Sequence, residues 1–156
     1  MFQKKIILLL LLLLSSCGYE AIYSKNNSSN YVFSISNLSF VGDRTVNLKI
    51  KEKLSAFTQG KKDKDLIIRI SSTSEKIILA KNTTGDATSF KNAISINVDV
   101  LMNDKFKSNF IILESFNYNN ISNKFNLKKY EEEIKSNLAE TASDKLIFKL
   151  SNIQWY

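Results

Sequence analysis

Cys17 is the residue whose surroundings in the sequence indicate a specific chemical modification. It is the only cysteine among the 156 residues, so its thiol has no partner in the chain for a disulfide. Ser15-Ser16 precedes it, and an unbroken apolar run, Ile6–Leu14, follows Lys4-Lys5. That run is too short to cross a hydrocarbon core, which takes about 20 apolar residues. A basic start, a short apolar run and small residues at the cleavage point predict a secretory signal peptide over residues 1–16.

The Leu14-Ser15-Ser16-Cys17 ending resembles the lipobox of bacterial lipoproteins, which are cut before the cysteine. Cys17 would then carry diacylglycerol and an amide-linked acyl chain. Because each buried CH₂ contributes about 0.8 kcal/mol and two or more chains hold stably, this residue would anchor a soluble domain to a membrane. We expect residues 17–30 to be the lipidated cysteine and a flexible tether, since Ser24–Asn30 is polar and aperiodic. The alternative is an ordinary cleaved signal that ends near a cysteine.

The composition restricts catalytic chemistry. The chain has no histidine, which excludes Ser-His-Asp and Cys-His catalysis and removes the commonest zinc ligand. A carboxylate-only or lysine-based active site stays open, but the densest acidic group, Glu131-Glu132-Glu133, is better explained by the macrodipole of a helix whose first turn it would occupy. We therefore predict no catalytic residue, no metal and no cofactor. The net charge of +7 favours an anionic partner without choosing among nucleic acid, anionic lipid and acidic glycan.

Alternation of apolar and polar residues predicts four strands. They cover Tyr31–Val41, Leu66–Leu79, Ala87–Met102 and Phe110–Tyr118, the last followed by a loop, Asn119–Asn126. The segment Ser71–Ser74 is polar on both faces, so we expect it to be exposed or at a sheet edge. The short turns between strands two, three and four predict that these strands are antiparallel.

Apolar residues at helical spacing predict two amphipathic helices. The first lies between Asp43, a predicted N-cap, and Gly60, and the second runs from Leu127 to Leu150. Two amphipathic helices need one apolar surface, which a four-stranded sheet offers. We therefore predict that residues 31–156 form a single α+β domain, a two-layer sandwich. Its order is β-α-β-β-β-α, and both helices lie on one face of a mostly antiparallel sheet.

The same alternation assigns side chains to the two faces of the sheet. We expect five residues to be buried between the sheet and the helices: Ile96, Val98, Phe116, Ile134 and Leu138. The other face would carry Ile67, Ile111 and Leu113 among polar residues. That face is apolar enough either to meet a partner or to be covered by the tether.

These features together resemble the LPS-assembly lipoprotein family LptE, also called RlpB. They are a Cys17-Gly18-Tyr19 start, an early strand, a helix opening near Asp43-Arg44, long antiparallel strands and a terminal helix ending at Lys145–Ile153. The resemblance implies a non-enzymatic lipoprotein, anchored to the periplasmic side of the cell outer membrane. It implies a protein that plugs an LptD-like β-barrel and helps it insert lipopolysaccharide into the outer leaflet, with no nucleic-acid partner.

Other functional classes stay open at the level of sequence. One is a periplasm-facing lipoprotein that activates a cell-wall synthase, and another is an accessory subunit of a lipid exporter. Co-purification with an outer-membrane barrel would separate these classes from the LptE-like function. An enzyme is the least favoured class, because no nucleophile–base pair is evident.

Strand directions in the predicted sheet bring several lysines to one tip of the domain. The second and fourth strands would run the same way, so their ends gather Lys81 and Lys91 with Lys124, Lys128 and Lys129. The loops concerned resemble those thought to touch lipopolysaccharide in the LptE family. We predict that Lys81, Lys124 and Lys128 receive the anionic head of the lipid, because converging ammonium groups act together. The alternative is that they are solvated surface lysines.

Overall fold

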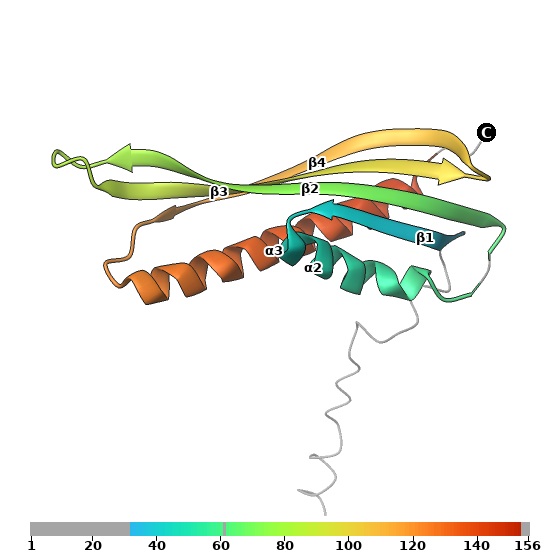
Figure 1. Cartoon of the computed structure of the whole chain (residues 1–156), viewed down its shortest axis with the longest axis horizontal. Coiled ribbons are helices and arrows are strands. Elements are labelled where there is room, and N and C mark those ends of the chain that lie inside the picture. The colour runs from blue at the N-terminus through green and yellow to red at the C-terminus, as the bar shows by residue number, and fades with distance from the viewer. Residues whose placement is uncertain (1–31, 61, 154–156) are drawn as a thin grey trace, which may run out of the picture. The chain divides into compact units, whose positions relative to one another are not determined.

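The computed structural model describes residues 32–60 and 62–153, so the predictions for Cys17, the signal peptide and the tether lie outside the described residues. Two helices and a four-stranded sheet form two layers, with both helices on one face of the sheet (Figure 1). In chain order the elements are β1 (Phe33–Gly42), α2 (Arg44–Leu54), a 3₁₀ turn η3 (Ser55–Phe57), β2 (Lys64–Lys81), β3 (Ala87–Met102), β4 (Lys105–Asn119) and α3 (Lys124–Ser151). The predicted α+β class and element order are confirmed.

The strand order of the sheet follows the sequence, β1-β2-β3-β4. β1 pairs with β2 in parallel, and the other two pairs are antiparallel, so β2 and β4 run in the same direction as predicted. Asn103 and Asp104 join β3 to β4 with φ angles of 52° and 58°. Positive φ at both central residues is the requirement of a tight two-residue hairpin, and Asn and Asp tolerate it better than most residues.

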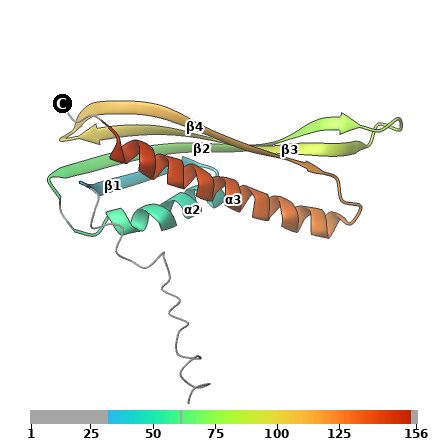
Figure 2. The ribbon, with the colours of Figure 1, turned by 180° about the vertical axis from the view of Figure 1, so that it is seen from behind.

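The core lies between the sheet and the helices, the two layers that Figure 2 shows with α3 in front of the sheet. The β3 residues that face the helices alternate with outward ones, and four of the predicted core residues are confirmed as buried: Ile96, Val98, Ile134 and Leu138. The prediction for Phe116 is wrong, because this side chain is 47% exposed. Phe116 faces the helix side, but β4 is an edge strand of the described sheet, and an open groove lies between Phe116 and α3.

Asp43 and Ser72 fix the junction of β1 and α2. Asp43 is the N-cap of α2, as predicted, and its side chain accepts a hydrogen bond from the Val46 N–H. Ser72 of β2 is 1% exposed and accepts the Asp43 N–H through its carbonyl oxygen. The expectation that the polar segment around it is exposed or at a sheet edge is confirmed for Ser71 and Thr73, which are exposed, and β2 is at the edge of the described sheet beyond Ser72. Ser72 itself is buried, because it faces this junction.

α3 begins earlier than predicted, at Lys124, with the Asn123 side chain accepting the N–H groups of Phe125 and Asn126. Glu131-Glu132-Glu133 therefore lies beyond the first turn, and the predicted macrodipole explanation for these acids is wrong. The apolar residues of α3 that are buried face the sheet and α2. Among the described residues, no helix combines the length and the apolar character needed to cross a membrane.

Candidate functional site

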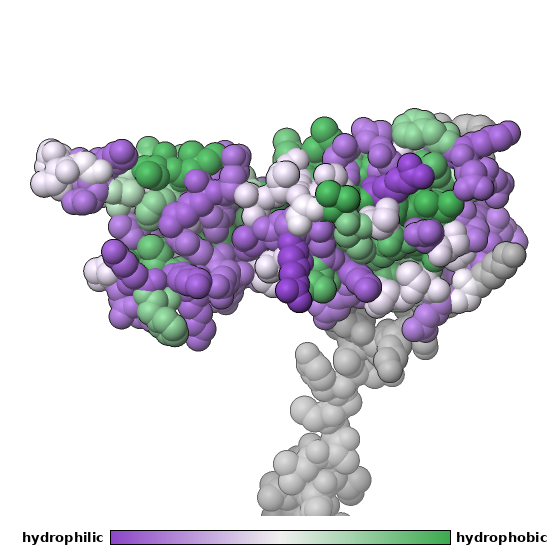
Figure 3. Space-filling model, in the orientation of Figure 1, coloured by the Kyte–Doolittle hydropathy of each residue, from purple (hydrophilic) through white to green (hydrophobic). Residues whose placement is uncertain are grey.

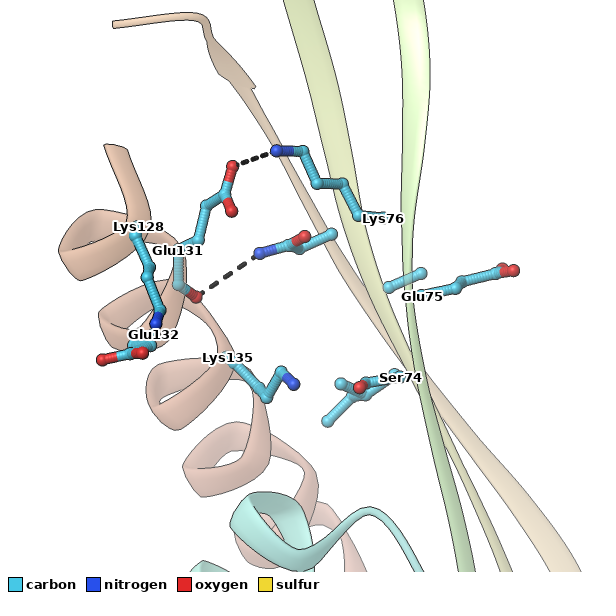
Figure 4. Close-up of a pocket in the computed structure, with 10 residues that line it drawn as sticks. Ser74, Glu75, Lys76, Lys128, Glu131, Glu132 and Lys135 are labelled. Carbon is cyan, nitrogen blue, oxygen red and sulfur yellow. Dashed lines mark hydrogen bonds and ion pairs between the residues drawn. The ribbon is translucent and has the colours of Figure 1, made fainter. Parts of the chain in front are cut away.

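A cleft of about 300 Å³ lies between the β2–β3 hairpin and the N-terminal part of α3 (Figure 4). β1 ends opposite Ser72, so beyond this point no other described strand pairs with that side of β2, and the described sheet is three strands wide. α2 does not reach this part of the sheet, where α3 is the covering helix (Figure 1). The cleft is lined by Ser74, Glu75, Lys76, Asn92, Ala93, Ile94, Lys128, Glu131, Glu132 and Lys135.

Glu131 connects α3 to three strands across this cleft. Its carboxylate forms an ion pair with Lys76 of β2 and accepts the Tyr118 hydroxyl of β4 at 2.9 Å. Its backbone carbonyl oxygen accepts the side-chain amide of Asn92 at 3.4 Å. The Lys76 ammonium also lies 3.9 Å from the centre of the Phe90 ring, a cation–π contact. Burial, reinforced by the Glu131 carboxylate, raises the pKa of Tyr118, so its hydroxyl stays a donor.

Asp43 is the second acidic residue that joins distant elements. It caps α2, accepts the Ser74 hydroxyl of β2 and forms an ion pair with the Lys135 ammonium of α3 at 3.1 Å. Burial opposes ionisation of Asp43, but the hydrogen bonds from Ser74 and the Val46 N–H, with the nearby Lys135, outweigh it. They lower the pKa of Asp43 from 3.8 to about 2. Lys76 and Lys135 are therefore both held by internal carboxylates.

The predicted lysines lie at one end of the described domain, but only one of them lines the cleft. Lys128 is among the lining residues and comes one turn after Lys124, the first residue of α3. Lys81 ends β2 and pairs with Ala87 at the far end of the hairpin. The hairpin tip and the start of α3 lie at the same end of the domain in both ribbon views (Figures 1 and 2). Lys91 instead lines a hollow on the sheet face away from the helices.

Within the described chain, the side chains of Lys81, Lys124 and Lys128 make no hydrogen bond or ion pair with one another or with other residues, and all three are exposed. This distinguishes them from Lys76 and Lys135. An ammonium group without an internal partner can donate charge-assisted hydrogen bonds to a phosphate or carboxylate. Their role in binding stays a prediction.

The acidic residues that join the elements were not identified as such from the sequence. The N-cap role of Asp43 was predicted, but its contacts with Ser74 and Lys135 depend on the tertiary structure. Pairing of β3 with β4 places Tyr118 opposite Phe90, on the sheet face that α3 covers, where its hydroxyl reaches Glu131. Alternation along β4 could have assigned Tyr118 to that face, but not its partner. Within residues 32–60 and 62–153, no three Asp, Glu, Cys or His residues come together in an arrangement that could hold a metal ion.

The surface around the site is mixed. On the side of the molecule drawn in Figure 3, hydrophobic areas are broken up by hydrophilic side chains. On the sheet face away from the helices, Ile111 and Leu113 are exposed at 57% and 70%, as the alternation predicted. Their neighbours on that face are Ser, Thr and Asn residues of β2 and β3.

Comparisons with known proteins give similarity of fold at low sequence identity. No family model matches the chain, and no curated protein matches it significantly. A rare lipoprotein B from Shewanella oneidensis superposes with a TM-score of 0.58 at 14% identity, over 73% of this chain and 92% of that one. An uncharacterized lipoprotein B from Nitrosomonas europaea gives 0.58 at 18% identity, over 76% and 83% of the two chains.

A minor lipoprotein from Acinetobacter baumannii gives the same TM-score of 0.58 at 9% identity, covering 78% of this chain and 91% of that one. The three solved proteins thus come from different bacteria and each matches over most of its own length. The chain therefore has the fold of the rare lipoprotein B (RlpB, LptE) structures, which confirms at the level of fold the resemblance stated from the sequence.

Proposed function

We propose that this protein is an outer-membrane lipoprotein that plugs an LptD-like β-barrel and assists it in inserting lipopolysaccharide into the outer leaflet. The observation that carries the proposal is the fold shared with the rare lipoprotein B structures, found in a chain whose Cys17 ends a lipobox-like sequence. The lipobox-like sequence lies at residues 14–17, whereas the fold is that of residues 32–60 and 62–153, so the two observations come from different parts of the chain.

Several physical features support the barrel and the lipid as partners. The lumen of a large outer-membrane barrel is polar. The sheet face of this domain that carries Ser, Thr and Asn residues suits contact with the wall of such a lumen. The anionic head of lipopolysaccharide offers phosphates, to which the unpaired ammonium groups of Lys81, Lys124 and Lys128 can donate. The anchor on Cys17 would hold the domain on the periplasmic side of the outer membrane.

The test of the barrel partnership is an affinity purification from detergent-solubilised outer membranes, with the tag at the C-terminus. We expect one β-barrel protein to co-purify in equal amount with the wild-type chain. A cell-wall synthase or the subunits of a lipid exporter in its place would contradict the proposal and favour the alternatives stated from the sequence.

The anchor is tested separately with Cys17→Ala. We expect this variant to incorporate no fatty-acid analogue in metabolic labelling and to leave the membrane fraction, because no other cysteine can carry the lipid. Ser16→Ala is the matched control and keeps the label, since it leaves a small residue before the cysteine. Label retained on the Cys17→Ala protein would disprove lipidation of Cys17. The proposed partnership with a barrel would be unaffected by that result.

A further inference from the structure

β4 is an edge strand, and among the described residues no strand pairs with its outer side. The unpaired N–H and C=O groups of such an edge can pair with another chain, and proteins usually protect them with charges, prolines or bulges. Near the start of β4 the pairing with β3 is irregular, between Val100 and Leu101. From Ser108 to Asn119 the pairing is regular, without proline, and Phe110–Leu113 carries no charge. This central part of the edge is therefore unprotected.

Apolar side chains flank the edge on both sides of the sheet. Ile111 and Leu113 are 57% and 70% exposed on the face away from the helices. On the helix side, a groove of about 250 Å³ runs between β4 and α3, which lie side by side in Figure 2. Its lining residues are Phe116, Tyr130, Glu133, Ile134, Asn137, Leu138 and Thr141. A strand added to β4 would thus meet apolar surface on both of its faces.

Apolar side chains also occur beyond the groove, toward the C-terminal end of α3. Phe148 is 69% exposed and follows Tyr130 by 18 residues, which at 3.6 residues per turn places both on the same stripe of the helix. The Phe110 ring lies above this part of α3, 5.3 Å from the Lys149 ammonium. The apolar surface therefore accompanies β4 along most of its regular length.

A strand with apolar side chains on both faces suits this edge, because successive side chains of a strand point to opposite faces. β4 itself has that property at Phe110–Leu113. If β4 pairs antiparallel with a second β4 about a two-fold axis at Ile112, then Ile111 lies opposite Leu113 and Asn109 lies opposite Ser115. On the face away from the helices, apolar residues thus meet apolar ones and polar residues meet polar ones.

On the helix side, the same register places Ile112 opposite its own copy and Phe110 opposite Glu114. The Glu114 carboxylate already forms an ion pair with Lys145 of α3, so it does not enter the interface as an uncompensated charge. No two like charges are opposite each other between Ser108 and Phe116, which removes the usual electrostatic obstacle to pairing of identical strands. The edge is therefore self-complementary in its pattern of apolar and polar residues on the face away from the helices, and it opposes no like charges.

We propose that β4 is the interface of a homodimer, in which two copies pair antiparallel about a two-fold axis at Ile112 and form one continuous eight-stranded sheet. Such an interface is isologous, with the same residues contributed by each copy. The inference concerns the protein on its own and does not depend on the proposed barrel partner.

The first experiment measures association of the purified full chain carrying Cys17→Ala, in mild detergent, by size-exclusion chromatography with light scattering over a range of concentrations. We expect a concentration-dependent dimer. Ile111→Lys with Leu113→Lys places like charges directly opposite each other and should weaken association at least tenfold. The matched control, Val41→Lys with Leu48→Lys, changes side chains that are 70% and 56% exposed on β1 and α2, and should leave the dimer intact.

The second experiment tests the register. Ile111→Cys and Leu113→Cys are made separately in the Cys17→Ala background, so that each protein has a single thiol. Directly opposed residues of antiparallel strands lie about 4.5–5.5 Å apart at Cα, within the range of a disulfide. Under mild oxidation the mixture of the two variants should form several-fold more covalent dimer than either variant alone.

Three results would overturn the proposal. One is a monomer at every concentration, which would exclude the homodimer and favour pairing of β4 with a strand of another protein. The second is association that the two β4 lysines do not weaken while the fold, checked by circular dichroism, is intact. The third is cross-linking of either cysteine variant alone that equals the mixture, because that result requires a different register.

Discussion

At the scale of single residues, Asp43 and Glu131 organise the cleft by joining elements that are distant in sequence. Asp43 connects the start of α2 with Ser74 of β2 and Lys135 of α3. Glu131 connects α3 with β2 through Lys76 and with β4 through Tyr118. Side chains committed to such contacts are poorly placed to bind a ligand. The lysines that remain without an internal partner are therefore the better candidates for ligand contact.

Asp43→Ala should lower the free energy of unfolding at pH 7 by about 1–2 kcal/mol, since it removes an N-cap and the contacts with Ser74 and Lys135. Because the pKa of Asp43 is lowered from 3.8 to about 2 in the folded protein, its contribution is full above the unfolded value and is lost as the pH falls toward 2. Urea unfolding between pH 7 and pH 2 should show the wild type and the variant converging. Glu132→Ala, at an exposed carboxylate without a bonded partner among the described residues, is the control and should show no such difference.

Tyr118→Phe should lower the free energy of unfolding by about 1–2 kcal/mol, because the Glu131 carboxylate and the buried Asn92 amide lose a hydrogen bond. Tyr130→Phe is the matched control, since its hydroxyl has no hydrogen bond within the described residues, and it should change stability by less than about 0.5 kcal/mol. Equal effects of the two substitutions in urea unfolding would contradict the role given to the Tyr118 hydroxyl.

At the scale of elements, the passage from β1 into α2 depends on a close backbone approach at Gly42. This residue has φ 101°, and a Cβ added there would lie 1.8 Å from the Ser72 carbonyl oxygen, the same oxygen that accepts the Asp43 N–H. Gly42→Ala should therefore lower the free energy of unfolding by about 3 kcal/mol or more. A left-handed conformation alone would cost about 1–2 kcal/mol. Gly85→Ala has φ 90° but open space around it, so thermal unfolding should show only the smaller cost. Similar melting temperatures for the two variants would mean that the approach at Gly42 relaxes.

The sequence predicted elements well where a local pattern decides the structure. β3 was predicted with the bounds it has, Ala87–Met102, because it is central and its alternation follows directly from one buried face. Phe116 was assigned to the correct face but not to the correct environment, because exposure depends on where α3 stops covering the edge strand. The start of α3 was missed because Phe125 in its first turn is exposed and off the buried stripe, and the apolar spacing begins only at Leu127.

At the scale of the whole molecule, contacts between elements divide the lysines into two groups. Lys53, Lys76, Lys135 and Lys145 form ion pairs that join helices to each other or to strands. The candidate lysines lie at the end of the domain that holds both the tip of the β2–β3 hairpin and the start of α3 (Figures 1 and 2). Strand directions and the order of the elements could predict the end of the domain where these lysines lie, whereas the ion pairs of the other lysines required the tertiary structure. The candidate site was therefore predictable as a region and not as a set of contacts.

The charge at that end of the domain gives the last prediction. Changing Lys81, Lys124 and Lys128 to Glu should weaken binding of purified lipopolysaccharide at least tenfold at low salt, because three attractive charges become repulsive. The effect should shrink at high salt, since exposed charges are screened over about 10 Å at 0.1 M ionic strength.

The matched control changes Arg44, Lys51 and Lys105 to Glu, which alters the net charge equally at exposed positions on α2 and at the start of β4. Circular dichroism should show both triple variants folded, since all six side chains are exposed. If the control weakens binding as much as the first variant, then net charge rather than this end of the domain governs the interaction. If neither triple variant weakens binding, the lipid is bound elsewhere. The ion pairs and hydrogen bonds around the cleft between the hairpin and α3 then have a structural role only.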